Sequence, residues 1–343
     1  MKWYFIQKLG LFIVLVFYYS IQVFSQNTGG NATYNFLSLP YSAKTTALGG
    51  INISYLGDDL GLAMFNPSLL SKEMDGNVQV SIRPYYANIQ QYDFSGATLW
   101  AKKDWMLGWG IHYMDYGSMK MTDAAGNEMG SFRPFDYVAQ ISLATSYIKN
   151  VQLGSTLKWI QSNYGMYKSN ALALDMAVRY TSSNELSQAS ILLTNMGAQL
   201  KTYTTKEDLP FNLIIGWSKK LEKAPIQFSL TAQKLSIWNN AYYDVNFANQ
   251  EGYKTPSALQ NLFNHFVLGT EAYIGNQVDL DFGYNFIRRF DLNIENQQNW
   301  FNGFSAGLGV KLPRTKIQYG NAFFQRNLYH HFSVFYSLKR TSN

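Results

Sequence analysis

The chain has 343 residues, of which 47% are hydrophobic, 16% are aromatic and only 15% are charged, against about 25% charged residues in an average soluble protein. Polar residues interrupt the apolar ones throughout, which excludes a polytopic helical membrane protein, and the abundant aromatic residues exclude a disordered chain. The net charge of +6 includes no Lys/Arg run longer than two residues, which argues against nucleic-acid binding. A secreted all-β sandwich and a transmembrane β-barrel remain.

The N-terminal 25 residues have the pattern of a signal peptide. Two lysines lie within residues 1–8, residues 9–19 are almost wholly apolar, and Val23 and Ser25 lie where a signal peptidase reads. We expect cleavage after Ser25 and export of the protein. The alternative, an N-terminal anchor, is disfavoured because the apolar core is shorter than about 18 residues. The chain contains no Cys, which excludes disulfides and a lipid-modified Cys.

Residues 26–75 differ in composition from the rest and are expected to form a plug, or hatch. Asn66-Pro67 predicts a turn, because proline fixes its own φ and Asn bonds to its own backbone there. Gly49-Gly50 permits a sharp turn into a short strand. Asp58-Asp59 is expected to cap a helix over residues 60–65. The alternatives are that the two aspartates bond to arginines of the lumen or that they bind a ligand or an ion.

Residues 76–343 are expected to form the barrel, because their side chains alternate between two faces. From Trp105 to Tyr113, for example, Trp, Leu, Ile and Tyr occupy one face and Met, Gly and His the other. Such alternation is typical of strands. It predicts about fourteen strands, over residues 77–86, 93–101, 105–117, 134–148, 151–163, 170–181, 187–197, 210–219, 226–237, 264–274, 277–287, 301–312, 315–325 and 328–338.

The connections between these strands favour a barrel over a sandwich. Tight turns alternate with mostly longer loops, of which the longest are residues 118–133, 239–263 and 288–300. Short turns at one rim, long loops at the other and an even number of strands are typical of outer-membrane barrels. Aromatic residues near strand ends would form the interfacial girdles; these are Trp100, Trp105, Tyr147, Tyr180 and Trp217.

The order of motifs in the N-terminal segment resembles a known family. Ser42-Ala43, then Ala47-Leu48-Gly49-Gly50, Asp58-Asp59 and Asn66-Pro67-Ser68-Leu69-Leu70 resemble the N-terminus of the PorV/PorQ family of outer-membrane barrels. That family is related to the fatty-acid transporter FadL, whose N-terminus forms a hatch inside a fourteen-stranded barrel. Chain length, residues 36–40 and residues 194–197 look most like the PorQ branch. The resemblance implies a component of type IX secretion that holds a PorZ-like surface protein in the sortase attachment complex.

The loop over residues 239–263 is expected to be the partner site. Its aromatic residues can act as rigid anchors for a protein partner, and the Asn and Gln residues among them can adapt their hydrogen bonds to it. The aromatic residues are Trp238, Tyr242, Tyr243, Phe247 and Tyr253. The alternative is that the aromatic residues fold back over the lumen as a lid. Outer-membrane lipid is a further expected partner, and the lumen leaves room for a bound lipid or detergent molecule.

Residues that could carry chemistry are few. None of the four histidines has metal-ligand spacing, and His330 and His331 point to opposite faces of a strand. No nucleophile elbow is present. The Gly307-x-Gly309 pair within a strand indicates packing, and Asp123–Glu128 indicates a solvated loop. We therefore expect no enzymatic activity, cofactor or metal.

The sequence thus predicts an all-β protein, a transmembrane antiparallel barrel of about fourteen strands with a FadL-like fold, in the outer membrane of a Gram-negative bacterium. The expected function is a docking platform in type IX secretion. The alternatives are a FadL-like transporter of hydrophobic small molecules and a structural barrel with neither ligand nor fixed partner. A transporter needs an apolar path through the hatch and usually a kinked strand, whereas a platform needs a sealed lumen and a shaped outer rim.

Overall fold

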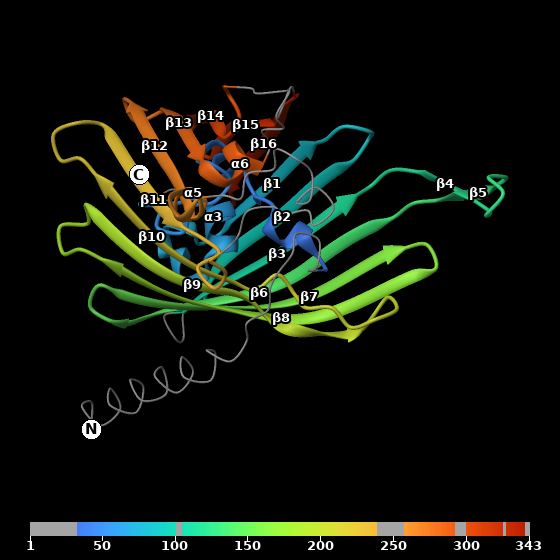
Figure 1. Ribbon diagram of the computed structural model, residues 1–343. Coiled ribbons are helices and arrows are strands. Elements are labelled where there is room, and N and C mark those ends of the chain that lie inside the picture. Colours follow the sequence, from blue (N-terminus) through green and yellow to red (C-terminus); the bar gives the residue numbers. More distant parts are fainter. Residues whose placement is uncertain (1–32, 101–104, 239–256, 292–299, 325–326, 340–343) are drawn as a thin grey trace.

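In the computed structural model, fourteen strands form one closed antiparallel barrel (Figure 1). The structure describes residues 33–100, 105–238, 257–291, 300–324 and 327–339. Neighbouring strands in the chain pair with each other, and β1 pairs with both β2 and β16, so the barrel has no free edge. The barrel strands are β1 (Asn77–Pro84), β2 (Gln90–Trp100), β3 (Trp105–Asp115), β6 (Phe135–Ile148), β7 (Val151–Tyr164), β8 (Tyr167–Thr181), β9 (Ser187–Lys201), β10 (Asn212–Lys220), β11 (Ile226–Ala232), β12 (Phe266–Ile274), β13 (Val278–Asn285), β14 (Phe304–Lys311), β15 (Thr315–Phe324) and β16 (Asn327–Ser337).

The predicted fold class is confirmed, and each of the fourteen predicted strands corresponds to one strand of the barrel. Several strands end earlier than expected, and two of these ends have a clear local cause. Strand β11 ends at Ala232, because Lys234 has a φ of 55° and turns the chain away. Strand β13 ends at Asn285, whose side chain accepts a hydrogen bond from the Arg288 backbone N–H at 3.3 Å. This bond starts the short helix α6 (Phe286–Asp291), where the sequence predicted strand.

The alternating side chains face as predicted. Ile111, Ile141 and Phe282 point outward and are 49%, 57% and 54% exposed, whereas their neighbours His112 and Gln140 point inward and are buried. An apolar belt of this kind suits a hydrocarbon environment. Trp100, Tyr147, Tyr180 and Trp217 lie exposed on the outer surface, and their role as an interfacial girdle stays a prediction.

The connections differ between the two ends of the barrel. Because consecutive strands alternate in direction, the four longest connections, between β3 and β6, β9 and β10, β11 and β12, and β13 and β14, lie at one end. The connection after β3 was predicted to be a loop but contains a two-stranded hairpin, β4 (Met119–Thr122) and β5 (Glu128–Phe132). Its turn is held by Asp123, which accepts hydrogen bonds from the Ala125 and Asn127 N–H groups at 2.9 and 2.8 Å.

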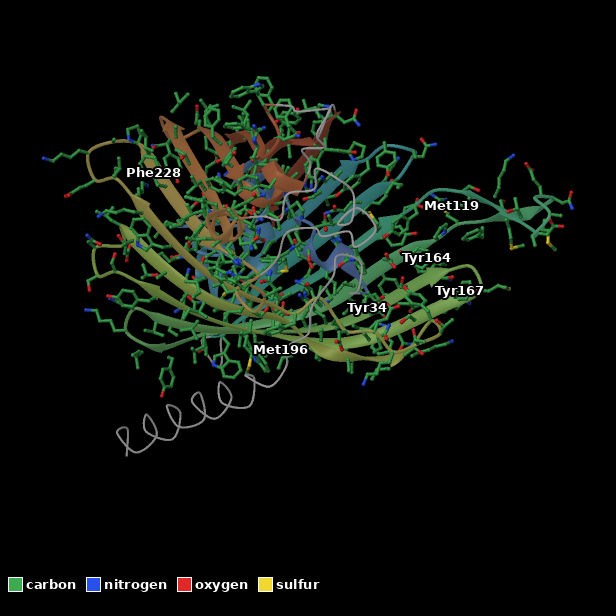
Figure 2. The ribbon with its side chains drawn as sticks, viewed as in Figure 1. Tyr34, Met119, Tyr164, Tyr167, Met196 and Phe228 are labelled. Atoms are coloured by element: carbon green, nitrogen blue, oxygen red, sulfur yellow. The ribbon has the colours of Figure 1, made fainter. Side chains whose placement is uncertain are left out.

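The β4–β5 hairpin projects well beyond the barrel (Figure 1), and side chains extend from both of its faces (Figure 2). Nearly all of its residues are exposed. It therefore gives the long-loop rim a distinct shape. Among the described residues, none of the helices has the length and apolar character needed to cross a membrane.

The two ends predict a topology in the membrane. An epitope tag inserted at Ala124-Ala125, in the hairpin turn, should be reached by antibody on intact cells, because long loops of such barrels face outward. A tag at Gly275-Asn276, in a short turn, should be reached only after permeabilisation. Immunofluorescence of both tagged strains checks this, and labelling of Gly275-Asn276 alone on intact cells would mean the opposite orientation.

Candidate functional site

Residues 33–74 lie inside the barrel and are called the plug below. The plug consists of short helices joined by irregular backbone: η1 (Asn35–Ser38), α2 (Ala43–Ala47), α3 (Leu60–Phe65), η2 (Pro67–Leu69) and η3 (Lys72–Met74). Most of its side chains are buried, and three apolar clusters join it to the wall. Phe36 and Val138 belong to one of these clusters, Leu62 and Met106 to another, and Ile53 and Ile214 to the third. The plug therefore has a packed core that it shares with the barrel.

The motifs singled out in the sequence shape the plug. Ser42 caps α2 by accepting a hydrogen bond from the Thr45 N–H at 3.1 Å, and Asp59 caps α3 through the Leu62 N–H at 3.0 Å. The capping expected of the aspartate pair is made by Asp59 alone. Asp58 is exposed, and its carboxylate accepts from the Ser71 hydroxyl at 3.2 Å.

The turn predicted at Asn66-Pro67 is present, and it also ties two parts of the plug together. The Asn66 side chain accepts from the Ser68 N–H at 3.0 Å and donates to the Ile53 carbonyl at 2.6 Å, while Pro67 begins η2. Gly49 and Gly50 have φ values of +94° and +91°, a conformation that favours glycine. The short strand expected after them is not formed, because residues 51–59 run as irregular backbone.

The plug backbone touches the barrel wall at glycines. A side chain at Gly320 would collide with the Ala43 carbonyl, one at Gly283 with the Gly49 backbone, and one at Gly154 with the Pro67 backbone. Beside these glycines, Ser333 accepts from the Ala43 N–H at 2.8 Å and Ser305 accepts from the Gly49 N–H at 3.0 Å. The wall and the plug therefore meet at main-chain distance.

Inward-pointing glutamines satisfy carbonyl groups of the plug. Gln91 donates to the Pro40 carbonyl at 2.7 Å, Gln140 to the Met64 carbonyl at 2.8 Å, and Gln188 to the Tyr55 carbonyl at 2.9 Å. These three side chains come from β2, β6 and β9. The polar inner face thus supplies the hydrogen bonds that an irregular buried backbone needs.

A buried ionic cluster joins the plug to the second half of the barrel. The Lys44 ammonium on α2 lies 2.9 Å from Asp279 and 3.1 Å from Asp281 on β13, and it also pairs with Glu271 on β12. The Tyr55 hydroxyl donates to Glu271 at 3.1 Å. Burial alone would lower the pKa of Lys44, but Tyr55 and the three carboxylates outweigh it and hold that pKa well above its usual value.

The alternation of apolar Leu280 and Phe282 with Asp279 and Asp281 predicts that the two aspartates point inward, but it does not identify Lys44 as their partner. Two acids two residues apart on an inward strand face would have signalled that a counter-charge is needed. Glu271, Asp279 and Asp281 are grouped closely enough to hold a cation. The Lys44 ammonium already occupies that position.

A cavity of about 160 Å³ lies between the plug and the long-loop end of the barrel. Its lining combines apolar plug residues with amides and two cationic side chains of the wall and α6. The lining residues are Leu37, Ser38, Gly50, Ile51, Phe65, Thr194, Asn195, Asn212, Gln233, Lys234, Asn285, Ile287 and Arg288. The cavity is therefore of mixed polarity.

Strand β9 is bulged next to this cavity. Its register against β8 shifts between Leu174 and Met176, and Asn195 has a φ of 58°. The Asp175 carboxylate fixes the bulge by accepting from the Asn195 N–H at 2.8 Å, and it also pairs with Lys158 at 2.6 Å. Bulges often bend a strand beside a functional site.

The predicted partner loop is described only at its two ends: residue 238 precedes it, and residues 257–263 include a short helix, α5 (Ala258–Phe263), where a loop was expected. Trp238 is 59% exposed, and its ring centroid lies 5.8 Å from that of His265. Tyr242, Tyr243, Phe247 and Tyr253 lie outside the described residues, as does the predicted signal peptide, residues 1–25. Their proposed roles stay predictions.

The histidines and the glycine pair lie as the sequence indicated. His331 points inward and its ring is 2.8 Å from the Thr46 hydroxyl, whereas His330 is only partly buried and bonds to Tyr319 at 2.7 Å. Gly307 leaves room for Ala47 of the plug, which is a packing role.

No protein-family model and no curated protein matches the chain. Among solved structures, the CymD monoaromatic hydrocarbon channel is similar with a TM-score of 0.52 and 12% identity, over 89% of this chain and 99% of that one. The toluene transporter TodX of Pseudomonas putida is similar with a TM-score of 0.50 and 12% identity, over 87% and 97% of the two chains. A FadL homologue of Pseudomonas aeruginosa has a TM-score of 0.48 at 10% identity, over 87% and 98%.

The fold is FadL-like. At this level of identity the likeness concerns architecture, namely the fourteen-stranded closed barrel. The specific assignment to the PorV/PorQ family rests on the motifs of the N-terminal segment and stays a proposal.

The ionic cluster predicts the effect of removing Lys44. Lys44→Met would leave Glu271, Asp279 and Asp281 buried without their main counter-charge, which costs about 3–5 kcal/mol in other proteins. We expect the folded, heat-modifiable band on gels to be lost at a lower temperature, and ion-conducting openings in planar bilayers to become more frequent.

The matched control is Lys316→Met. Lys316 also pairs with Asp279, at 3.1 Å, but its side chain is 20% exposed. In the Lys316→Met variant, Lys44 would still pair with Glu271, Asp279 and Asp281. This variant should behave nearly like the wild type. Equal stability and conductance for Lys44→Met and Lys316→Met would show that the cluster does not hold the plug.

Proposed function

We propose that the protein is a non-enzymatic docking platform in the outer membrane, which holds a PorZ-like surface protein in the attachment complex of type IX secretion. The observation that carries the proposal is that the plug fills the lumen while the β4–β5 hairpin shapes the outer rim. These are the two features that a platform needs. The secretion system itself is inferred from the resemblance of the plug motifs to the PorV/PorQ family, and of chain length and residues 36–40 to its PorQ branch.

The way the plug is held supports a static role. Its contacts with the wall combine main-chain approach at glycines, buried glutamine bonds and the Lys44 cluster. Displacing the plug would break its buried glutamine hydrogen bonds and the Lys44 ion pairs, which are costly to leave unsatisfied. A partner bound at the rim requires none of these contacts to change.

The docking proposal predicts loss of a surface partner from a loop variant. Replacing Tyr242, Tyr243 and Phe247 together with Ser should release the partner into the medium, because truncated aromatic hot spots cost about 2 kcal/mol or more, roughly thirtyfold in affinity. The measurement is co-purification of partners from native outer membranes, with identification by mass spectrometry, beside assay of the medium.

A matched triple variant in the hairpin controls for general damage to the rim. Met119, Met121 and Met129 are 40%, 39% and 64% exposed. Their replacement with Ser keeps the hairpin backbone, and with it the shape of the rim, and should leave the partner on the cells, because the aromatic anchors are expected in the loop over residues 239–263. Both variants must keep the heat-modifiable band. Retention of the partner by the loop variant would reject this loop as the docking site, and wild-type barrels that capture no secretion-system protein would reject the function.

A second candidate function is transport of a hydrophobic small molecule. The comparisons favour it more directly than they favour docking, because the similar structures are described as a hydrocarbon channel and a toluene transporter. The bulge at Asn195, beside the cavity, adds the kinked strand that a transporter usually has. The polar share of the cavity lining, which includes Asn212, Gln233 and Arg288, argues against an apolar path there.

Uptake of radiolabelled toluene separates the two candidates. Cells that express the wild-type protein should take up toluene at the rate of vector controls, because the plug closes the lumen. The matched variant lacks Asn195, which removes the extra residue of the bulge. Uptake several-fold above the vector, falling back when Asn195 is deleted, would establish transport in place of a platform.

A further inference from the structure

Two arginines lie at the long-loop end of the lumen without an acidic partner among the described residues; Arg83 is buried and Arg288 is partly buried. Arg83 on β1 points inward and is 1% exposed, and its Nε and Nη1 atoms have no hydrogen-bond partner among the described residues. Arg288 on α6 has a buried Nη1 atom in the same condition. Neither guanidinium takes part in an ion pair within the described part of the chain.

The groups around these arginines are mainly aromatic. The Arg83 guanidinium lies 4.8 Å from the centroid of the Tyr85 ring, and the Arg288 guanidinium lies 5.0 Å from that of Phe324. Tyr329 joins the two sides, because its ring contacts both Tyr85 and Phe324, at 5.4 and 5.1 Å. Arg83, Tyr85, Phe324, Tyr329 and Arg288 therefore form one cluster, which draws on β1, β15, β16, α6 and the connection after β1.

Aromatic faces attract a guanidinium but do not neutralise it. The carboxylate that acts on Arg83 is Asp93, and its oxygens are bound by His112 and, at 2.9 Å, by Gln91. Burial, followed by the charge of Arg83, lowers the pKa of Arg288 to about 9, which leaves it positive at neutral pH. Two like charges, one buried and one partly buried, are thus only partly compensated, which is a costly arrangement unless an anion binds beside them.

Space for such an anion lies beside Arg288. The guanidinium borders the 160 Å³ cavity, and the amides of Asn212, Gln233 and Asn285 line the same space. Gly50 of the plug lies directly against the Arg288 guanidinium, where a side chain would displace it. At about 30 Å³ per water molecule, the cavity has room for a group the size of acetate or phosphate with some water.

We propose that Arg288, with the amides of the cavity wall, forms a binding site for a small oxyanion, a carboxylate or a phosphoryl group, at the top of the plug, and that Arg83 adds positive charge beside it without lining the cavity. The planar guanidinium fork of Arg matches the paired oxygens of both groups. Amides of the cavity wall would donate to the remaining oxygens. The site does not depend on which of the two proposed functions holds, because it needs only the described cluster and cavity.

The test is titration calorimetry on the full-length protein in detergent, with sodium phosphate and sodium acetate at ionic strength fixed by sodium chloride. We expect saturable binding of at least one of the two anions. Acetate alone would identify a carboxylate site, phosphate alone a phosphoryl site, and both the shared chemistry. Absence of saturable binding for both anions would overturn the proposal.

Variants locate the site. Arg288→Gln should weaken binding about tenfold or more, since a charge-assisted hydrogen bond is lost. Arg83→Gln removes a nearby positive charge but no lining group, and it should weaken binding less than Arg288→Gln. Arg288→Lys keeps the charge without the fork and should weaken binding less than Arg288→Gln, and it serves as the second variant if Arg288→Gln does not fold. Lys120→Gln removes a cation of the hairpin whose side chain is 73% exposed and should bind like the wild type. Equal affinity of all folded arginine variants and the wild type would overturn the proposal.

Discussion

A barrel whose inner face is polar has to satisfy that face within its own lumen, because buried donors and acceptors without partners destabilise a fold. In this protein the plug meets a large part of that requirement, and side-chain nitrogen atoms of Arg83 and Arg288 are among the groups it leaves without hydrogen-bond partners in the described part of the chain. Gln91, Gln140 and Gln188 donate to its carbonyl groups, and Asp279 and Asp281 receive the Lys44 ammonium. The lumen is therefore the polar core of the protein, and the plug is shaped so that its backbone meets the donors and acceptors of the wall.

The plug in turn needs hydrogen-bond partners from the wall. The plug contains only short helices, so most of its backbone groups need partners from outside it. Glycines such as Gly154 and Gly320 bring the wall close enough for serines and glutamines of neighbouring strands to supply them. The capping residues Ser42 and Asp59 satisfy the rest locally. Plug and wall are thus complementary in hydrogen bonding as well as in shape.

The sequence was sufficient to predict the strands, because an apolar outward face and a polar inward face give the side chains a period of two residues over most of each strand. The β4–β5 hairpin gave no such signal, since nearly all of its residues are exposed on both faces. The partners of Lys44 could not be predicted either, because 227 to 237 residues separate it from Glu271 and Asp281. The caps and turns of the plug were easier to predict from the sequence, since they depend on local spacing around Asp59 and Asn66.

The contacts of the plug also constrain the order in which the protein can assemble. Helix α3 and η2 contact strands from β1 to β8, whereas α2 contacts β13 to β16. Ala43 bonds to Ser333, 290 residues later in the chain. The plug is synthesised before the barrel strands, so it can complete this contact only after the last strands are present. Strand β1, which directly follows the plug, is also one side of the β1–β16 seam. Pairing β1 with β16 places α2 beside the strands that it contacts, so we expect closure of the seam and docking of α2 in the lumen to be coupled.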